Sequence, residues 1–410
     1  MAHLLIKLFG EKFMRIGIFS WESLNSIPVG GVAVHVTELA KALSRLGHEV
    51  HVFTRIGDGQ KEYEIIDGVY EHRCISPGCD DFIEHMDHVC DSMVSCFHYV
   101  ENKFGKFNIL HAHDWHTVNA LANIKNHRGY PFVWTCHSTE YGRNGNNFNP
   151  SWFSARIRHR EWLGGYISSW VITVSNTMKY EIMREYQTPD WKIDVIYNGI
   201  NLEKYNGTLD AGRIKEKYGV WPLDPVILFV GRMSYQKGPD LLVEAIPNVL
   251  NEHPEARFIF VGSGGMIDHV NGRSWWLGIQ DKIRVLGYVP ENELLNLYKA
   301  CDFVCIPSRN EPFGIVTLEA WASGKPVVGT DVGGMSEIIW NFVTGVKVYP
   351  TPESIAWGIK YFLNNPDKIK WMSENCRVAA KDFGWDSIAK TTVDVYKKVL
   401  EGDSKWEASY

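Results

Sequence analysis

The chain has 410 residues, of which 45% are hydrophobic and 22% are charged, a composition typical of globular proteins with a sizeable core. This length exceeds the usual size of one domain and therefore favours two. The formal net charge of −6 and the lack of a Lys/Arg stripe argue against a nucleic-acid partner.

The eight cysteines are scattered and include no Cys-x-x-Cys pair, so the sequence predicts neither a zinc ribbon nor a redox motif. Reduced thiols in the cytoplasm are the expectation. No apolar run approaches the length of a membrane-spanning helix, so no integral membrane segment is expected. Residues 1–13 lack a small-residue cleavage site, and we expect a short extension there, with Met14 as the working start, rather than a signal peptide.

The first elements form a βαβ unit. An apolar strand is predicted at Arg15–Ser20, and a polar loop, Ser23–Gly31, ends in Gly30 and Gly31. An amphipathic helix follows, and then a strand at Val50–Thr54. Ligands bind where such a loop leaves the strand. Two adjacent glycines allow a ligand to approach the backbone, although a tight turn explains them equally well.

A run of polar and aromatic side chains follows the strand predicted at Asn108–His111 and precedes the helix Val118–Ile124. The run contains His111, His113, Asp114, Trp115 and His116. We expect Trp115 and His116 to face a cleft between the domains, where a ligand would bind. The alternative is that Trp115 caps the core and Asp114 caps the next helix. A metal site is a further alternative, because His111 and His113 share a strand face, but no helical His-x-x-x-His closes it.

The remainder of this half alternates between strands and helices. Predicted strands lie at Tyr63–Cys74 (a small β excursion), Phe132–Cys136, Val171–Val174 and Asp194–Ile196, and predicted helices at Asp80–Phe104 and Trp152–Tyr166 and from the N-cap Ser175 to Tyr186. The turn pair Asn198-Gly199 marks the crossing to the second domain.

The second half repeats the same order of elements. It has a strand at Val226–Val230, a basic loop, a helix at Asp240–Leu250 and strands at Phe258–Val261, Ile283–Leu286, Phe303–Pro307 and Val327–Gly329. Helices between these strands predict a parallel sheet, so both halves read as Rossmann-like domains. The expected boundaries are 1–198 for the first domain, 199–384 for the second, and 385–410 for a terminal helix that packs back on the first.

The loop Gly231–Gly238 carries Arg232 and Lys237, which can both reach one diphosphate. Arginine grips phosphate oxygens as a fork and lysine as a point charge, and together they would neutralise a departing nucleoside diphosphate. The usual state of loop cations is solvation, which is the alternative. No Asp-x-Asp occurs, so the obvious carboxylate pair for a metal bound to a diphosphate is missing.

We place the chemistry at Arg309–Glu319. Pro312 favours a first helical turn, which would leave the amides of Phe313, Gly314, Ile315 and Val316 as an open helix end that attracts anions. Glu311 would stand at its lip and Glu319 about two turns inside, so a ligand there needs hydroxyls as well as negative charge, as a nucleotide sugar has. An ordinary helix start is the alternative.

Seven residues in this order across two Rossmann-like halves resemble the retaining GT-B glycosyltransferases: Gly30, Gly31, His137, Arg232, Lys237, Glu311 and Glu319. The resemblance implies an α/β fold with two doubly wound parallel-sheet domains facing a cleft. It also implies that Gly30 and Gly31 face the donor phosphates and acceptor, that His137 contacts the transferred sugar and that Arg232 and Lys237 hold the diphosphate. Glu311 would bind sugar hydroxyls and Glu319 the ribose.

Three further segments look like glycogen and starch synthases: His113–Thr117, Thr173–Ser175 and Asn198–Ile200. The bacterial enzymes of that group usually carry Cys after Glu-Pro and lack the second Glu. Phe313 and Glu319 instead look like the broader family of sucrose, trehalose and lipid-linked sugar transferases, which leaves the acceptor open.

The sequence therefore predicts a retaining transferase that moves glucose from ADP-glucose or UDP-glucose to an α-glucan or oligosaccharide, without a cofactor or metal. The expected catalytic residues are His137, Arg232, Lys237 and Glu311. Donor contacts are expected at Gly30, Gly31, Arg232, Lys237, Phe313–Val316 and Glu319, and acceptor contacts at Asp114, Trp115, His116 and Asn198. The alternatives are a small-sugar, sugar-phosphate or lipid acceptor, a nucleotide-sugar epimerase, and a non-catalytic sensor.

Overall fold

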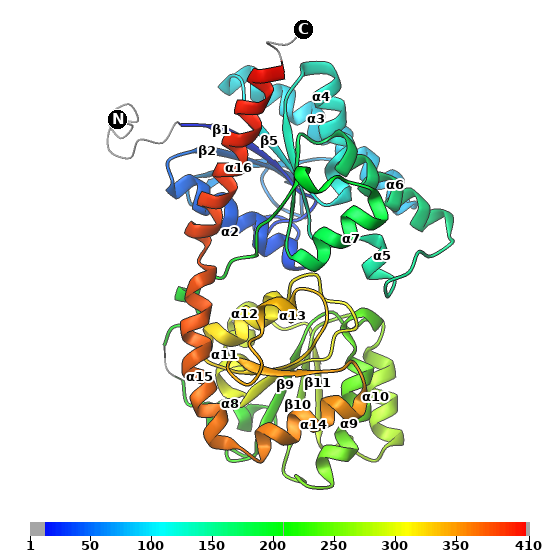
Figure 1. Cartoon of the computed structure of the whole chain (residues 1–410), viewed down its shortest axis with the longest axis vertical. Helices are drawn as coiled ribbons and strands as arrows, with labels where there is room; N and C mark the ends of the chain where they lie inside the picture. Colours follow the sequence, from blue (N-terminus) through cyan, green and yellow to red (C-terminus); the bar gives the residue numbers. More distant parts are fainter. Residues whose placement is uncertain (1–12, 208, 407–410) are drawn as a thin grey trace. The chain divides into compact units, whose positions relative to one another are not determined.

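The computed structural model describes residues 13–207 and 209–406, and the expectation for residues 1–12 lies outside them. The chain divides into two compact units (Figure 1). The first contains Asn147–Asn198 together with the described residues before Gly142 and after Gly384. The second contains Gly142–Asn146 and Gly199–Gly384.

The first unit is built on an eight-stranded sheet with the order β3-β4-β2-β1-β5-β6-β7-β8. Neighbouring strands pair in parallel except β3 with β4, which are antiparallel. The strands are β1 (Arg15–Phe19), β2 (Glu49–Arg55), β3 (Tyr63–Ile66), β4 (Val69–Cys74), β5 (Ile109–His113), β6 (Phe132–Cys136), β7 (Trp170–Thr173) and β8 (Ile193–Val195).

Helices cover both faces of this sheet. They are α2 (Gly31–Arg45), α3 (Phe82–Phe104), α4 (Val118–Arg128), α6 (Trp152–Ile167), α7 (Asn176–Tyr186) and α16 (Trp385–Trp406), whereas the short α5 (Glu140–Arg143) has residues in both units. Alternate residues of β1 point to opposite faces. Ile16 and Ile18 join the core formed with α2 and α16, whereas the ring of Phe19 meets that of Phe97 on α3. The last helix, α16, runs beside α2 (Figure 1).

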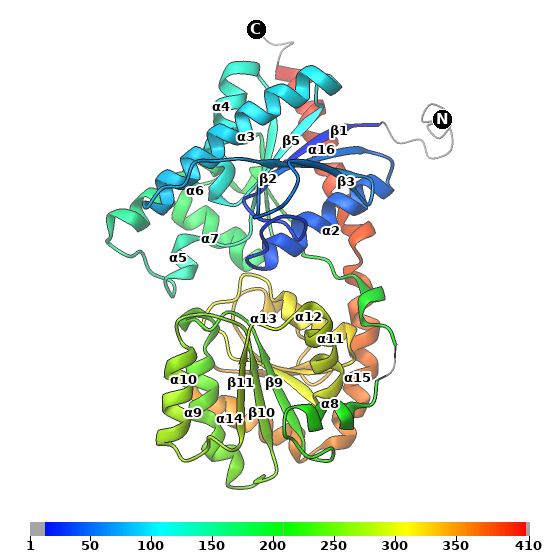
Figure 2. The same ribbon diagram turned by 180° about the vertical axis from the view of Figure 1, so that it is seen from behind.

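The second unit has a six-stranded, fully parallel sheet with the order β11-β10-β9-β12-β13-β14. The strands are β9 (Val226–Val230), β10 (Arg257–Val261), β11 (Ile283–Gly287), β12 (Phe303–Ile306), β13 (Val327–Thr330) and β14 (Gly345–Val348). The main helices are α8 (Ala211–Lys217), α9 (Pro239–Leu250), α10 (Ile267–Trp276), α11 (Glu291–Ala300), α12 (Ile315–Ala322), α13 (Met335–Ile338), α14 (Pro352–Leu363) and α15 (Pro366–Ala380). Figure 2 shows α9, α10 and α14 on one side of this sheet and α8, α11 and α15 on the other.

In each sheet the strand order reverses direction at one place. In the first unit β1 lies between β2 and β5, and in the second β9 lies between β10 and β12. Open α/β sheets bind ligands outside the carboxyl ends of the strands at such a reversal. The fold therefore predicts ligand binding at the loops after β1 and β5 in the first unit and at the loops after β9 and β12 in the second.

The predicted parallel α/β fold is confirmed, and most predicted elements lie within two residues of the observed ones. The predicted N-cap is also confirmed, because the Ser175 hydroxyl accepts the Met178 N–H at 3.1 Å. Two differences affect the site: β5 continues through His113, and α12 begins only at Ile315. Among the described residues, no helix is both long and apolar enough to cross a bilayer.

Candidate functional site

In the second unit, two loops leave β9 and β12 and touch. The backbone N–H of Arg309 donates to the carbonyl of Gln236 at 2.8 Å. Gly238 permits this approach, because its φ is +66° and a Cβ there would lie 2.2 Å from the Pro307 carbonyl oxygen. The two loops are therefore fixed against each other before any ligand arrives.

An ion pair joins the same two loops. The ammonium of Lys237 donates to both carboxylate oxygens of Glu311, at 2.9 and 2.7 Å, and the hydroxyl of Ser308 donates to one of them at 3.0 Å. Glu311 is 6% exposed, so its carboxylate needs these partners. The Gly334 N–H also fixes its backbone by donating to the Glu311 carbonyl at 2.9 Å. The sequence predicted both residues as site residues but not that they pair.

The second predicted cation, Arg232, is exposed on the same loop as Lys237. Its guanidinium donates to the Gln236 side chain at 3.2 Å, and that amide donates to Asn310 on the neighbouring loop at 3.3 Å. Gln236 is 5% exposed and links the two loops through both its side chain and its carbonyl. Sequence reasoning missed it, because a lone Gln in a basic loop carries no distinctive signal.

The predicted helix end needs correction. The helix α12 begins at Ile315, and Gly314 precedes it with a φ of +102°, so Phe313 and Gly314 are not part of its first turn. The Phe313 side chain is 2% exposed and belongs to the core, which leaves only its backbone for a ligand. Pro312 lies three residues before the helix and does not start it. The glycine's left-handed conformation sets the helix start instead.

Glu319 is the fifth residue of α12, little more than one turn inside rather than two. Its carboxylate accepts the hydroxyl of Tyr298 at 2.6 Å. Burial raises the pKa of Glu319 above its ordinary value, while the Tyr298 hydrogen bond opposes the rise. The carboxylate thus has one fixed partner and lies on the helix that follows Glu311.

In the first unit, the loop after β1 is organised by a carboxylate that sequence reasoning missed. Glu22 is 3% exposed, and its Oε2 accepts the N–H groups of both Val29 and Gly30 at 2.7 Å. Burial raises the pKa of Glu22, and the two backbone hydrogen bonds oppose that rise. These two amides already have an acceptor, so the expected role of Gly30 toward a donor phosphate is limited to close approach of its backbone.

Three buried histidines meet at the carboxyl ends of β5 and β6. His113 Nδ1 and His137 Nε2 are 3.0 Å apart, and the ring of His35 on α2 contacts both rings. His35 Nδ1 is 2.7 Å from the side-chain oxygen of Asn198, another predicted site residue. The structure therefore brings His137 and Asn198 into one cluster. The ring of His111 packs against that of His113, with centroids 4.2 Å apart, but its two nitrogens are directed at Tyr396 and Thr135 instead of at the other histidines.

Asp114 follows β5 in an unfavourable backbone conformation, with φ of +54° and ψ of −178°. Such conformations cost on the order of 1–3 kcal/mol and occur mostly at functional sites. Hydrogen bonds hold it on all sides: its backbone N–H donates to the Thr135 carbonyl at 2.9 Å, the backbone N–H of His137 donates to Asp114 Oδ1 at 2.7 Å, and the Trp134 indole donates to the Asp114 carbonyl at 3.2 Å. Its carboxylate makes no cap to the following 3₁₀ turn, so the alternative capping role is wrong.

Trp115 and His116 are packed within the first unit. Trp115 is 3% exposed, and His116 is stacked between it and Trp21, with ring centroids 4.0 and 4.3 Å apart. The guanidinium of Arg160 lies 5.6 Å from the Trp115 ring centre. The expectation that Trp115 offers an open face to a sugar is therefore wrong, and the alternative of a core position is correct.

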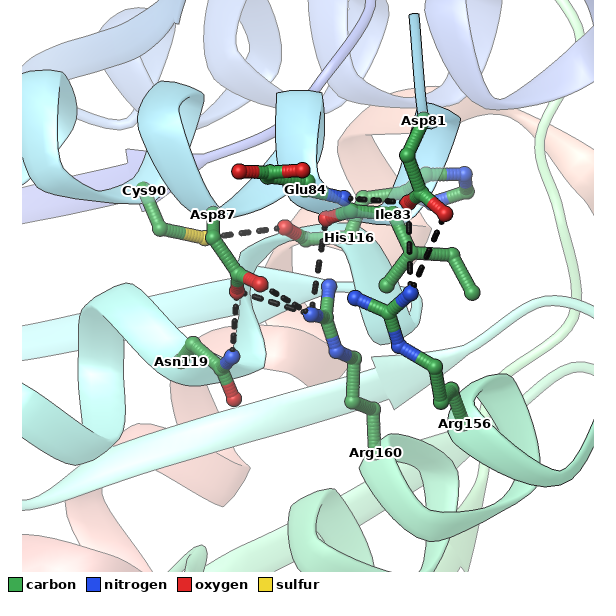
Figure 3. A network of polar contacts seen from close by, with 9 residues as sticks. All are labelled: Asp81, Ile83, Glu84, Asp87, Cys90, His116, Asn119, Arg156 and Arg160. Atoms are coloured by element: carbon green, nitrogen blue, oxygen red, sulfur yellow. Dashed lines mark hydrogen bonds and ion pairs between the residues drawn. The ribbon is translucent and has the colours of Figure 1, made fainter. Parts of the chain in front are cut away.

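A polar network of side chains from α3, α4 and α6 packs against this aromatic stack, and Figure 3 shows the network together with His116. Arg160 donates to both oxygens of Asp87 at 2.7 Å, and Asn119 donates to one of them at 2.8 Å. The thiol of Cys90 donates to the His116 carbonyl at 3.1 Å. The network accounts for Trp115 and His116 by packing, and it leaves His113 and Asp114 as the residues of that run with a functional signature.

Burial keeps the histidine cluster uncharged. It lowers the pKa of His137 to about 3. The pKa values of His35 and His113 are also lowered well below their ordinary value, first by burial and then by neighbouring histidines. A neutral imidazole both donates and accepts hydrogen bonds. The cluster is thus suited to hydroxyl groups or to a metal ion rather than to an anion.

Two family models match the chain. The model described as "Glycosyl transferases group 1" matches residues 211–379, and "Glycosyltransferase Family 4" matches residues 29–204. The first match lies within the second unit and covers both of its site loops. The second spans most of the first unit, including the histidine cluster.

Individual proteins are similar over nearly the whole chain. An uncharacterized glycosyltransferase of Methanocaldococcus jannaschii is 39% identical, over 95% of this chain and 99% of its own. A glycogen synthase of Mycobacterium tuberculosis is 28% identical, over 95% of this chain and 96% of its own. The structure of sucrose-phosphate synthase from Thermosynechococcus elongatus, 22% identical, superposes with a TM-score of 0.80 over 95% of this chain and all of that one, and its likeness concerns the fold.

The neutral histidines predict a pH-dependent stability. They are uncharged when folded but take up protons when unfolded, so their contribution is complete above about pH 6.5 and is lost as the pH falls. Below about pH 6.5, each of these three histidines should lower the free energy of unfolding by about 1.4 kcal/mol per pH unit. Chemical unfolding at several pH values between pH 7 and pH 4 measures this slope of the unfolding free energy against pH. His137→Gln should reduce the slope, whereas the exposed control His127→Gln should not; equal slopes in all three proteins would contradict the assignment.

Proposed function

Because this chain belongs to the group 1 glycosyl transferases, we propose that it transfers glucose from a nucleoside diphosphate to the end of an α-glucan with retention of configuration. The observation that carries the proposal is the pair of linked loops after β9 and β12, which gather Arg232, Lys237 and Glu311 at the reversal of the sheet. A diphosphate requires cations and a sugar requires hydrogen-bonding carboxylates, and these loops provide both.

In the proposed reaction, an acceptor hydroxyl attacks the anomeric carbon from the face of the leaving group. The new glycosidic bond forms as the bond to the diphosphate breaks, and a phosphate oxygen takes the hydroxyl proton. Arg232 and Lys237 neutralise the charge that grows on the phosphate, and Glu311 binds sugar hydroxyls. Glu319 serves the ribose. None of these steps uses a metal ion.

The first unit supplies the remaining proposed contacts. Neutral His137 donates to or accepts from a hydroxyl of the transferred sugar, because its pKa of about 3 keeps it uncharged. Asp114 and Asn198 are proposed to serve the acceptor, and the strained backbone of Asp114 supports this. Trp115 and His116 are assigned to packing beneath Asp114. All eight cysteines are free thiols, which supports a cytoplasmic location.

An α-glucan is proposed as the acceptor because the similar glycogen synthase covers nearly the whole chain. Glu319 and its Tyr298 contact favour a second candidate, transfer to a small sugar or sugar phosphate, because the resemblance to that broader group depends on this second carboxylate. A single assay separates the two candidates.

The protein should be incubated with ADP-glucose or UDP-glucose and a malto-oligosaccharide, and the products separated by length. The expected result is a ladder that lengthens by single glucose units with new α-linkages. Products only from glucose or fructose phosphate would support the second candidate and contradict the glucan. Release of an isomerised nucleotide sugar without any acceptor would contradict transfer and indicate an epimerase.

Lys237→Ala should lower kcat about a hundredfold, equivalent to about 3 kcal/mol, because the lost cation acts on charge that develops in the transition state. Activity of the unmodified protein should survive EDTA. The matched control is Arg309→Ala, which removes an ion pair from the loop after β12 to Asp240 on α9 and a hydrogen bond to the Tyr235 carbonyl, and leaves the side chains of Arg232, Lys237 and Glu311 in place. Equal losses in both variants, or a magnesium requirement after EDTA treatment, would contradict the assignment.

Gly30→Ala tests whether a ligand approaches the loop after β1. The residue has extended backbone, and an added Cβ would meet no atom within 4 Å, so the fold should accept the methyl group. Stability should rise by about 0.4–1 kcal/mol, because the unfolded chain loses freedom. If a substrate packs on Gly30, its KM should rise about tenfold, or about 1.4 kcal/mol.

The control is Gly272→Ala on α10, where an added Cβ also meets nothing within 4 Å. Thermal unfolding and steady-state kinetics of the two variants measure both effects. An unchanged KM in Gly30→Ala would show that no substrate packs on this glycine and that it serves the turn alone.

A further inference from the structure

The histidine cluster of the first unit has the composition of a metal site. Among residues 13–207 and 209–406, one group of His, Cys, Asp or Glu side chains lies close enough to hold an ion: His35, His113 and His137. One ring nitrogen from each lies within 4.8 Å of the others, and all three side chains are buried. They come from α2, β5 and the exit of β6, three elements whose positions the sheet fixes.

The orientation of His35 is set as in a metal ligand. Its Nδ1 lies 2.7 Å from the side-chain oxygen of Asn198, which can only accept, so Nδ1 carries the proton. The lone pair is then on Nε2, which is buried and has no hydrogen-bond partner among the described residues. Metal-binding histidines commonly donate their other N–H to a carbonyl oxygen in this way.

The other two rings present nitrogens to each other. His113 Nδ1 and His137 Nε2 are 3.0 Å apart, near the roughly 3.3 Å between two nitrogens bound to one tetrahedral zinc ion. Without an ion, the pair must share a proton. His113 Nε2 is a second buried nitrogen with no partner among the described residues. When His113 Nδ1 binds an ion, Nε2 carries the proton of that ring, so the nitrogen that lacks a ligand is His35 Nε2.

The chemistry of the site also fits a cation. Imidazole binds metal only when neutral, and burial keeps these rings unprotonated well below pH 7. The carboxylate of Asp114, which accepts the backbone N–H of His137 at 2.7 Å, places negative charge beside the cluster. Three nitrogen ligands suit zinc, copper, nickel or cobalt rather than magnesium or calcium.

We propose that His35, His113 and His137 form a binding site for a divalent transition-metal ion, with three imidazole ligands and a fourth position open to water or an anion. None of the steps proposed for glucosyl transfer uses this ion. One part of the inference rests on the proposed function: a bound ion engages the ring of His137 and so competes with the contact of His137 to the transferred sugar. The ion would therefore act as an inhibitor.

The test measures metal binding to the full chain without donor or acceptor. Protein stripped with EDTA and dialysed is titrated with Co²⁺, followed by its visible d–d absorption, and with Zn²⁺, followed by elemental analysis after gel filtration. The expected result is about one ion per chain and the intense absorption of tetrahedral cobalt. Absence of stoichiometric binding to the unmodified protein would overturn the proposal.

His35→Gln and His113→Gln should each weaken binding at least about tenfold. The matched control is His72→Gln, because His72 Nε2 lies 2.9 Å from His51 Nδ1 in a buried histidine pair of the same unit that has no third histidine ligand. This variant should bind cobalt as the unmodified protein does. Binding that is unchanged in both cluster variants, or lost equally in the control, would overturn the assignment.

Thermal unfolding gives a second measurement for variants that fold poorly. Zn²⁺ should raise the midpoint of the unmodified protein and of His72→Gln but not that of His35→Gln. The transfer assay separates this inference from the proposed function. Stoichiometric cobalt binding with no glucan transfer would leave the metal site standing and overturn the function, whereas transfer that zinc leaves unchanged at a saturating dose would overturn the inhibitory role.

Discussion

The site of the second unit depends on the ion pair between Lys237 and Glu311. A carboxylate that is 6% exposed is tolerable only with a cation and hydrogen bonds, and Lys237 and Ser308 supply them. The pair can form because glycines let the loops approach: a Cβ on Gly238 would lie 2.2 Å from the Pro307 carbonyl oxygen, and a Cβ on Gly333, in the loop after β13, would lie 1.9 Å from the Glu311 carbonyl oxygen. The ion pair and the glycines therefore act together to hold the two loops in contact before a ligand binds.

The two units stabilise their buried ionisable groups in opposite ways. The loops of the second unit keep buried charge by pairing it, whereas burial holds His35, His113 and His137 neutral in the first. Glu22 is intermediate, because two backbone N–H groups hold its carboxylate directly and the guanidinium of Arg55 adds a smaller Coulomb attraction. The charged loops suit a diphosphate and the neutral cluster suits hydroxyl groups or a metal, so the chemistry of each ligand matches the way its site manages charge.

Most of the fold could be predicted from the sequence, because buried parallel strands are continuous apolar runs and caps such as Ser175 are local. The cations Arg232 and Lys237 and the carboxylate Glu311 were found because they follow strands at a loop. Contacts between distant segments were not predictable: nothing in the sequence pairs Lys237 with Glu311 or places Glu22 on the amides of Val29 and Gly30. The expectation that Trp115 faces a ligand fails for the same reason, since the network through Arg160 and Asp87 that packs on Trp115 comes from two other helices.

The ion pair also constrains how a donor can bind. Lys237 cannot serve a diphosphate at full strength while both its strongest contacts go to Glu311, so binding must redistribute them. A sugar hydroxyl that donates to Glu311 would replace part of what the lysine supplies and free its charge for the phosphate. On this argument neither half of a nucleotide sugar binds well alone. A diphosphate without a sugar would draw Lys237 away from Glu311 and leave the buried carboxylate without its cation. A sugar without a diphosphate would leave Lys237 paired with Glu311 and would gain nothing from its charge. The pairing that stabilises the empty loops is thus itself a source of selectivity for the intact donor.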